Sequence, residues 1–531
     1  MAHTIQIVVM LLVVIAAVGI VAKRLQVPPA ILLVITGVIL ALVPGLPAVS
    51  LAPEFVLLLV LPPVIYISAV QMSWLEFRFN LRPISLLAVG CVGFTTVSAA
   101  AATHWLLGMP WPVGFVLGAI VSPPDAVAPL SIARRMGIPR RILVILEGEG
   151  LANDATALIL YRFAVLAVSA GAFSFGKAAG MFAAIVVGEL LWGLVVGWLM
   201  LRLRRWVDDP KIEILLSILT PFLAYWPPWY YGGSGVLATV VAGLYVSWNG
   251  ARLISAATRL QGIFFWDVLD YLIEGVVFLL TGLQARTLIT GIGSYSTSLL
   301  ITSATVVTLV VILARFVWIY PAVYLPRKLS AAIARADPAP PWQWPFMLAF
   351  TGVRGIDSLA AALAIPLATN VGSPFPDRDL IFLLTFAVIL VTLVGQGLML
   401  PNVVRALGLA NAGVNERRID RREEVKARLE AIEAALARLE QITADSAIPE
   451  ELVQPLKTQY KARLTHFDRR TGVDPAPSKR TDELEFLMIA AERERINELH
   501  RAGRLKDEGR RRVELELDLL AAMLSNHQHS E

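Results

Sequence analysis

The sequence predicts an all-α polytopic membrane protein with about thirteen transmembrane helices and a helical tail. Of the 531 residues, 56% are hydrophobic and only 16% are charged, and the mean hydropathy is +0.67. Soluble globular chains carry about 25% charged residues, so this composition indicates a membrane protein. Long apolar runs alternate with short polar connectors up to residue 400, after which charged residues become frequent.

Thirteen apolar runs are candidate membrane spans. They cover residues 4–22, 29–47, 53–71, 84–107, 112–130, 142–169, 178–201, 212–228, 235–247, 261–284, 298–324, 343–366 and 379–400. The first run has no basic residue before it and no small-residue cleavage pattern after it. It is therefore expected to be a transmembrane helix rather than a signal peptide.

The connectors between the runs differ in charge on the two sides of the membrane. One side carries Lys23, Arg24, Arg78, Arg82, Arg134, Arg135, Arg140, Arg141, Arg202, Arg204, Arg205, Lys211, Arg252, Arg259, Arg327, Lys328 and Arg335. The other side carries only Lys177, Arg286 and Arg378. Because basic loops stay in the cytoplasm, we expect a multi-pass protein of the inner (plasma) membrane with its N-terminus outside and its tail inside.

Two neighbouring spans carry polar residues where an apolar helix is expected. Asp125 follows Pro123 and Pro124 in the fifth span, and Glu149, Asn153 and Asp154 lie in the sixth. A charge at the centre of a membrane helix costs about 2.5–3.5 kcal/mol on insertion scales, so a cluster indicates a function. A broken helix with its carboxylate beside a second buried carboxylate can hold a cation halfway across a membrane. The alternative is a structural cluster that pairs only within itself.

The fifth and twelfth spans are interrupted in corresponding ways. Prolines break the fifth span at residues 122–125, and glycines loosen the twelfth in the sequence GVRGID, residues 352–357. Spans seven apart cross the membrane in opposite directions, which is typical of inverted repeats whose broken helices meet at the midplane. Arg354 would then be available to form a supporting ion pair with Glu149, either as pure architecture or as part of ion handling.

Four sequence motifs together resemble a known family. The motifs are LPPVIY, SPPDAVAP, EGEGLANDATALILYRFAV and FTGVRGIDSLAAALAIP. They are similar to those of the monovalent cation:proton antiporter family, in its bacterial sodium/proton exchanger branch. The resemblance extends from the first span to about Leu409, and the tail is also similar.

The resemblance implies both an architecture and residue roles. The family implies a homodimer with a dimerisation half and a mobile core half, which works by alternating access. Asp154 would be the ion-binding carboxylate with Asn153 as its partner, and Asp125 would lie at the helix crossing. A monovalent cation is thus expected at Asp154 and Asp125, while Glu149 and Arg354 would form the supporting ion pair.

The chemistry of a buried carboxylate agrees with an exchange function. Such a group binds either H+ or a hard cation, because burial favours its protonated form when no cation is present. The neighbour of Asp154 is Asn153 rather than a second carboxylate, so one proton is expected per cation and the exchange is electroneutral. Na+ is the expected cation. The family usually has a hydroxyl where Gly150 stands and often one where Pro124 stands, and either could be a cation ligand, so their absence here leaves K+ and Li+ as alternatives.

Two further membrane carboxylates are candidate second titratable groups. Asp357 lies three residues after Arg354, and a local salt bridge between them is favoured. Glu274 shares one helix face with Asp267 and Asp270, which could draw cations in or pair with nearby arginines. If Asp357 or Glu274 also releases a proton during transport, the prediction of electroneutral exchange fails.

The chain is expected to divide into a transmembrane domain, residues 1–409, and a cytoplasmic helical tail, residues 410–531. The tail contains a heptad stripe of Val425, Leu429, Ile432, Leu436 and Leu439, which favours helices that pack on each other. The single cysteine, Cys91, excludes a disulfide framework. The expected partners are Na+ (or K+ or Li+), H+, membrane lipid and a second copy of the chain, with no cofactor and no nucleic acid.

Two other function classes rank below a cation:proton antiporter that serves pH homeostasis. A cation channel would need a repeated filter or a continuous polar pore. An intramembrane aspartyl-type protease would need a catalytic pair, which Asp125 and Asp154 could mimic, but no Gly-x-Gly-Asp element accompanies them. We therefore expect a transporter and not an enzyme.

Overall fold

The chain is built from α-helices in the computed structural model. The structure describes residues 2–44, 52–170, 175–207, 209–291, 296–369, 373–445, 449–470, 476–501, 504, 509–510, 513–514 and 516–521, and no β-strand occurs among them. Its internal contacts divide the chain into two units, Met1–Val414 and Asn415–Glu531, near the boundary predicted at Leu409.

Among its described residues, the first unit contains twenty α-helices. They are α1 (Ala2–Leu25), α2 (Pro29–Leu42), α3 (Leu61–Gln71), α4 (Trp74–Phe79), α5 (Leu81–Ser85), α6 (Val92–Leu107), α7 (Trp111–Val121), α8 (Val127–Met136), α9 (Arg140–Ala170), α10 (Phe175–Arg204), α11 (Pro210–Tyr230), α12 (Val236–Leu253), α13 (Ala256–Leu283), α14 (Ala285–Gly291), α15 (Thr297–Leu329), α16 (Ala331–Ala336), α17 (Gln343–Phe350), α18 (Ile356–Leu363), α19 (Arg378–Leu390) and α20 (Gly397–Ala406) within the described residues. Three π-helical segments, Phe55–Val60, Leu86–Cys91 and Val391–Gln396, extend or join neighbouring α-helices.

Each of the predicted spans overlaps one of these helices or a pair of them. Among the described residues, six helical stretches are both long enough and apolar enough to cross a bilayer: Gln6–Leu25, Leu81–Leu107, Arg140–Ser169, Ala179–Arg204, Thr297–Leu329 and Arg378–Ala406. Other apolar helices are shorter, and the count of thirteen spans remains a prediction. Both interruptions lie where the sequence predicts them, between α7 and α8 and between α17 and α18.

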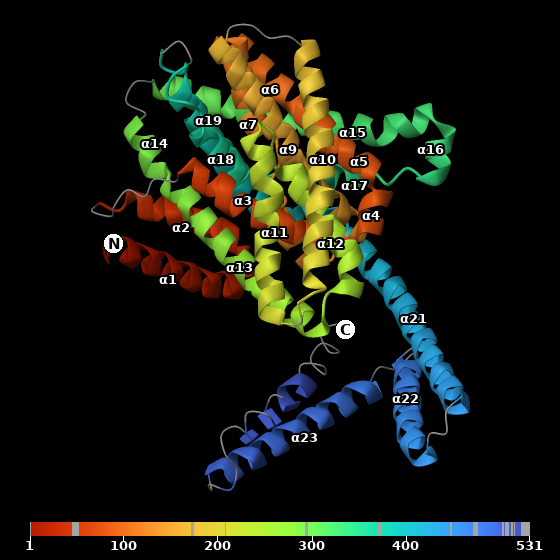
Figure 1. Cartoon of the computed structure of the whole chain (residues 1–531). Coiled ribbons are helices and arrows are strands. Elements are labelled where there is room, and N and C mark those ends of the chain that lie inside the picture. The colour runs from red at the N-terminus through yellow and green to blue at the C-terminus, as the bar shows by residue number, and fades with distance from the viewer. Residues whose placement is uncertain are drawn as a thin grey trace. The chain divides into compact units, whose positions relative to one another are not determined.

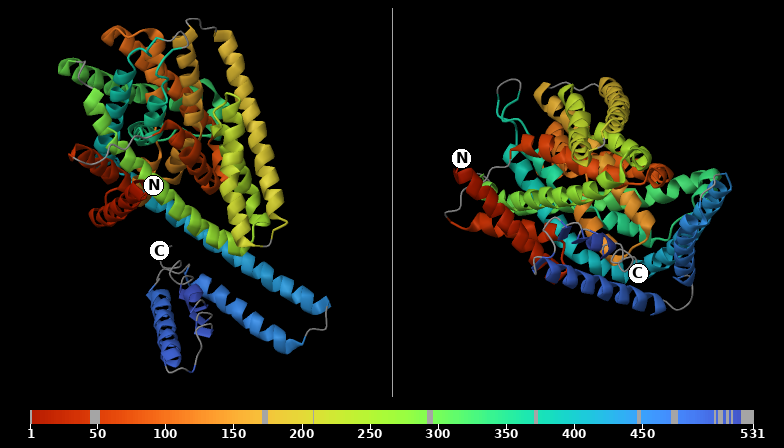
Figure 2. Two further views of the ribbon diagram at one scale, coloured as in Figure 1. Left: turned by 60° about the vertical axis from the view of Figure 1, so that its left-hand side comes forward. Right: turned by 60° about the horizontal axis from the view of Figure 1, so that its bottom comes forward.

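Small residues allow close helix packing within the first unit. Helix α13 packs against α2, where a Cβ on Gly37 would lie 2.4 Å from the carbonyl oxygen of Leu279. Helices α10, α11 and α12 pack on one another, as Figure 1 shows. Helix α1 packs on α2 and α13 at one edge of the bundle (Figure 2).

A buried carboxylate in α10 fixes the start of α12. Glu189 accepts hydrogen bonds from the backbone N–H groups of Ser234, Gly235 and Leu237, and its Oε2 lies 2.8 Å from Ser234 Oγ. These N–H groups would otherwise be unpaired at a helix N-terminus inside an apolar region, and a negative charge is favourable there. Glu189 was not predicted as a structural residue, although it is a lone carboxylate in an apolar run.

An ion-pair network joins three helices at the ends that carry basic connectors. The carboxylate of Asp337 pairs with Arg82, with Arg141 at 2.8 Å and with Arg327 at 2.6 Å. Partial burial raises the pKa of Asp337, but hydrogen bonds from Arg141 and Arg327 lower that pKa below its ordinary value overall. One carboxylate thereby links α5, α9 and α15.

The second unit is also helical. It contains most of α21 (Leu409–Asp445), together with α22 (Glu450–Arg470) and α23 (Ala476–Arg501). The residues of the predicted heptad stripe, Val425, Leu429, Ile432, Leu436 and Leu439, are buried or half-buried along α21.

Candidate ion-binding site

The two interrupted helices touch at their breaks. Pro123 and Pro124 lack N–H groups and end α7, and the N–H of Asp125 donates to the carbonyl oxygen of Val353 in the other break at 2.7 Å. The Asp125 carboxylate accepts the N–H of Val127, the first residue of α8, at 2.8 Å. A Cβ on Gly355 would overlap the Asp125 side chain, so only glycine fits this close approach.

Arg354 holds the broken end of α7. Arg354 is 1% exposed, and its Nε donates to the carbonyl oxygen of Val121 at 2.9 Å, with a further bond to Gly352 O. Its backbone N–H donates to Thr392 Oγ1 at 3.0 Å. The last carbonyl groups of a helix carry partial negative charge, so this buried cation offsets the end of α7.

The supporting ion pair differs from the prediction. Glu149 pairs with Arg315 of α15 through two hydrogen bonds, one of them 2.7 Å from Nη2 to Oε2, and Arg315 Nε donates to Leu348 O. Both side chains are fully buried. Arg354 was predicted to be the partner, but its donors are used by the carbonyl groups at the two breaks. The signal for Arg315 was a single arginine in an otherwise apolar span.

Asn153 and Asp154 lie on α9 beside the first break. Asn153 is completely buried, and its Nδ2 donates to the carbonyl oxygen of Pro124 at 2.7 Å. That carbonyl group is available because the prolines end the helix there. Among the described residues, Asn153 Oδ1 has no hydrogen-bond partner. Asp154, only 8% exposed, follows directly in the sequence and lines a cavity.

This cavity brings together carboxylates from four elements. It has a volume of about 230 Å³. Asp125, Asp154 and Asp357 line it around the breaks, and Asp270 and Glu274 line it from α13. Arg134 of α8 and Glu147 of α9 also line the cavity and form an ion pair, with 2.6 Å between Nη2 and Oε1. Asp125 and Asp154 therefore line the same cavity, and Asn153 contacts the break at the carbonyl oxygen of Pro124 without lining the cavity.

Asp357 is placed differently from the local salt bridge that the sequence favours. Helix α18 begins at Ile356, so Arg354 lies outside the helix and its side chain is directed to the end of α7. Asp357 lies in the first turn of α18 and lines the same cavity as Asp154. It also lines a smaller cavity on the far side of Asp154, together with Tyr161.

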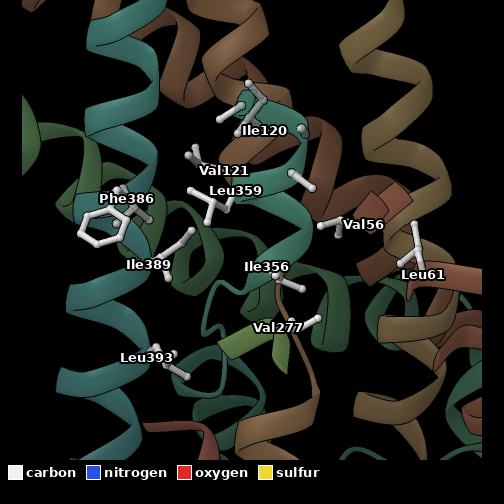
Figure 3. Packing of buried hydrophobic residues seen from close by; sticks show 14 of the residues in the cluster. Val56, Leu61, Ile120, Val121, Val277, Ile356, Leu359, Phe386, Ile389 and Leu393 are labelled. Atoms are coloured by element: carbon white, nitrogen blue, oxygen red, sulfur yellow. The ribbon is translucent and has the colours of Figure 1, made fainter. Parts of the chain in front are cut away.

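Apolar side chains enclose the site. Figure 3 shows Ile120 and Val121 of α7, Leu359 of α18 and Ile389 of α19 in one cluster of buried residues next to the breaks. An apolar environment strengthens electrostatic interactions, because it excludes water and lowers the local dielectric constant. The carboxylate groups that line the cavity are therefore polar groups within an apolar surrounding.

An all-helical membrane protein with buried carboxylates around two touching helix breaks belongs to the class of cation transporters. Comparison with known proteins identifies the family. Residues 8–406 match the model of the transmembrane sodium/hydrogen exchanger family, and the chain belongs to that family. Its members are transporters rather than enzymes, which excludes the intramembrane protease alternative.

Several relatives match most of the chain. An uncharacterized Na+/H+ exchanger of Mycobacterium tuberculosis is 34% identical over 511 residues, covering 93% of this chain and 92% of that protein. A sodium, potassium, lithium and rubidium/H+ antiporter of Bacillus subtilis is 31% identical over 476 residues, covering 87% of this chain and 70% of that protein. The sodium proton antiporter MjNhaP1 from Methanocaldococcus jannaschii has the same fold, with a TM-score of 0.61 at 20% identity, over 76% of this chain and 97% of that one.

Proposed function

We propose that the protein exchanges H+ for a monovalent cation at Asp154, with Na+ first and K+ or Li+ as alternatives. Family membership establishes cation/proton antiport as its activity. The observation that carries the assignment to Asp154 is its position in a cavity at two touching helix breaks, next to Asn153, which is bonded to a break carbonyl. The relative in B. subtilis is named for transport of all three of these cations and of rubidium, which supports a site that tolerates several ions.

In this proposal, H+ and the cation compete for the Asp154 carboxylate. The Asp125 carboxylate and carbonyl groups freed by the breaks supply further oxygens, which are the ligands that hard cations prefer. Asn153 acts by position, since its bond to Pro124 O fixes α9 against the break. Arg354 and the Glu149–Arg315 pair maintain the geometry of the breaks and do not bind the ion.

We propose alternating access because cavities of different size lie on the two sides of Asp154. The cavity extends from Asp154 to Arg134 and Ser131 near the end of α8, which leads to a basic connector. On the other side of Asp154 lies the smaller cavity, which has a volume of only about 20 Å³ and is lined by Leu57, Leu61 and Tyr161. With the positive-inside orientation, the larger cavity lies on the cytoplasmic side of Asp154, and movement of the core against the dimerisation half of a homodimer would open the opposite side.

We propose that one proton is exchanged per cation, although Asp357 lies in the same cavity. Arg315 balances Glu149, and Asp125 lies where its own break touches the other break, which contains Arg354. One bound cation balances one of the two remaining carboxylates at the breaks, Asp154 and Asp357. An uncompensated charge in an apolar region is costly, so the loaded site is most stable when Asp357 keeps its proton.

Reconstitution tests the proposed function directly. Purified protein in liposomes with a pH-sensitive dye inside is given Na+, K+ or Li+ on one side. Proton movement driven by an opposing cation gradient is expected with at least one of these cations. Folded protein that moves no protons with any of them would contradict cation/proton exchange, and cation flux without obligatory proton movement would indicate a channel.

The stoichiometry has its own test in the same liposomes. Exchange by the wild type is expected to be insensitive to a clamped membrane voltage, because equal charges move in opposite directions. The variant Asp357→Asn, which resembles the protonated carboxyl group, is expected to exchange with the same insensitivity. Voltage-dependent exchange in the wild type would contradict the 1:1 stoichiometry. If the voltage dependence then disappears in Asp357→Asn or in Glu274→Gln, that residue carries the second proton.

A further inference from the structure

A second cavity lies away from the ion site, in the part of the bundle formed by α3 and α10 to α13. Its volume is about 500 Å³, within the range of about 300–1,000 Å³ that is typical of small-molecule sites. Its walls are mostly apolar and include Ile214 of α11, Val246 of α12 and Ile263 of α13. Ile263 is 63% exposed, so the cavity borders a surface that faces lipid in a membrane.

One buried cation lines this apolar cavity. Arg204, the last residue of α10, is 4% exposed. Its Nη2 lies 3.4 Å from the hydroxyl groups of Tyr66 and Thr220, which are long contacts, and its Nε has no hydrogen-bond partner among the described residues. A buried charge held only by distant neutral hydroxyl groups is costly unless an anion pairs with it.

The other charged residues that line the cavity leave a net positive charge. Arg259 and Asp267 of α13 contribute one charge of each sign, so Arg204 remains in excess. The hydroxyl groups of Ser217 and Thr258 also line the cavity. The end of α10 leads into a basic connector, so the cavity lies toward the membrane face where cytoplasmic anionic headgroups are expected.

We propose that this cavity binds one anionic phospholipid, with its phosphate at Arg204 and an acyl chain along the apolar wall. The arrangement matches both parts of such a molecule: a cation for the headgroup, and an apolar space that opens toward the bilayer. Arg205 provides a matched comparison, because it neighbours Arg204 on the same connector but is exposed and does not line the cavity. Nonspecific attraction of anionic lipid would depend on both arginines equally.

Native mass spectrometry of the delipidated full-length protein tests this site with phosphatidylglycerol and phosphatidylcholine as probes. One phosphatidylglycerol per chain is expected to bind at least about tenfold more tightly than phosphatidylcholine, because the choline ammonium group of phosphatidylcholine offsets the charge of its phosphate, whereas phosphatidylglycerol brings a net negative charge to Arg204. Arg204→Gln is expected to lose this preference, and Arg205→Gln to keep it. Equal effects of the two substitutions would overturn the proposal.

A second variant tests the same site if Arg204→Gln fails to fold. A Cβ on Gly262 of α13 would meet no atom within 4 Å, and Gly262 lines the cavity, so Gly262→Phe is designed to fill the space of the acyl chain while Arg204 is intact. This variant is expected to lose the bound phosphatidylglycerol. Retention of the lipid would overturn the proposal, as would inorganic phosphate displacing it at millimolar concentration, because the site would then be one for a free anion.

Discussion

Asp154→Asn is expected to abolish cation-driven proton movement while the protein still folds. The amide has the size of the carboxyl group, but it neither takes up and releases a proton nor offers a negative charge to a cation. Asp154 has no ion-pair partner among the described residues, so its replacement breaks no salt bridge. Removing an unpaired buried carboxylate leaves folding stability unchanged or increases it.

The measurement compares Asp154→Asn with Asp379→Asn in the same liposomes. Asp379 lies at the start of α19 with its side chain 71% exposed, so the control makes the same chemical change outside the cavity. Internal pH is followed after addition of Na+, K+ or Li+. The control is expected to exchange like the wild type, and the Asp154 variant to match empty liposomes. Exchange by Asp154→Asn at the wild-type rate would place the ion-binding carboxylate elsewhere, first at Asp357.

The breaks were predictable because their causes are local. Pro123 and Pro124 lack the N–H groups that would continue α7, and the glycines at Gly352 and Gly355 allow a backbone path that other residues would block. The importance of Asn153 and Asp154 could also be predicted, since polar residues deep in an apolar run seldom have a purely structural role. The spans followed from the same reasoning, although the π-helical segments have no signature in hydropathy.

The pairing of buried charges was not predictable in the same way. The choice between Arg315 and Arg354 as partner of Glu149 depends on how three helices are rotated in the bundle, and sequence spacing carries no such information. The expected bridge between Arg354 and Asp357 failed for a different reason. The i,i+3 rule holds only when both residues are in one helix, and α18 begins between them.

Breaking the Glu149–Arg315 pair is expected to have the largest effect on stability. Arg315→Met would leave the fully buried Glu149 carboxylate without its cation and cost about 3–5 kcal/mol, as is usual when one partner of a buried pair is removed. Glu149→Met would leave Arg315 unpaired at a similar cost. The double variant Glu149→Met/Arg315→Met removes both charges and is expected to recover most of the loss, because an apolar replacement of a whole pair is often neutral.

Matching variants of Arg354 test which arginine is the partner of Glu149, in addition to how much the ion pair contributes to stability. The fraction of protein that stays monodisperse after heating in detergent reports stability for each single and double variant. Arg354→Met is also expected to destabilise, since it removes the donor to Val121 O, but Glu149→Met should not rescue it. Rescue is therefore expected for Arg315 and not for Arg354. The reverse pattern would mean that Glu149 is held by Arg354, as the sequence alone predicts, and that the bidentate contact with Arg315 does not control stability.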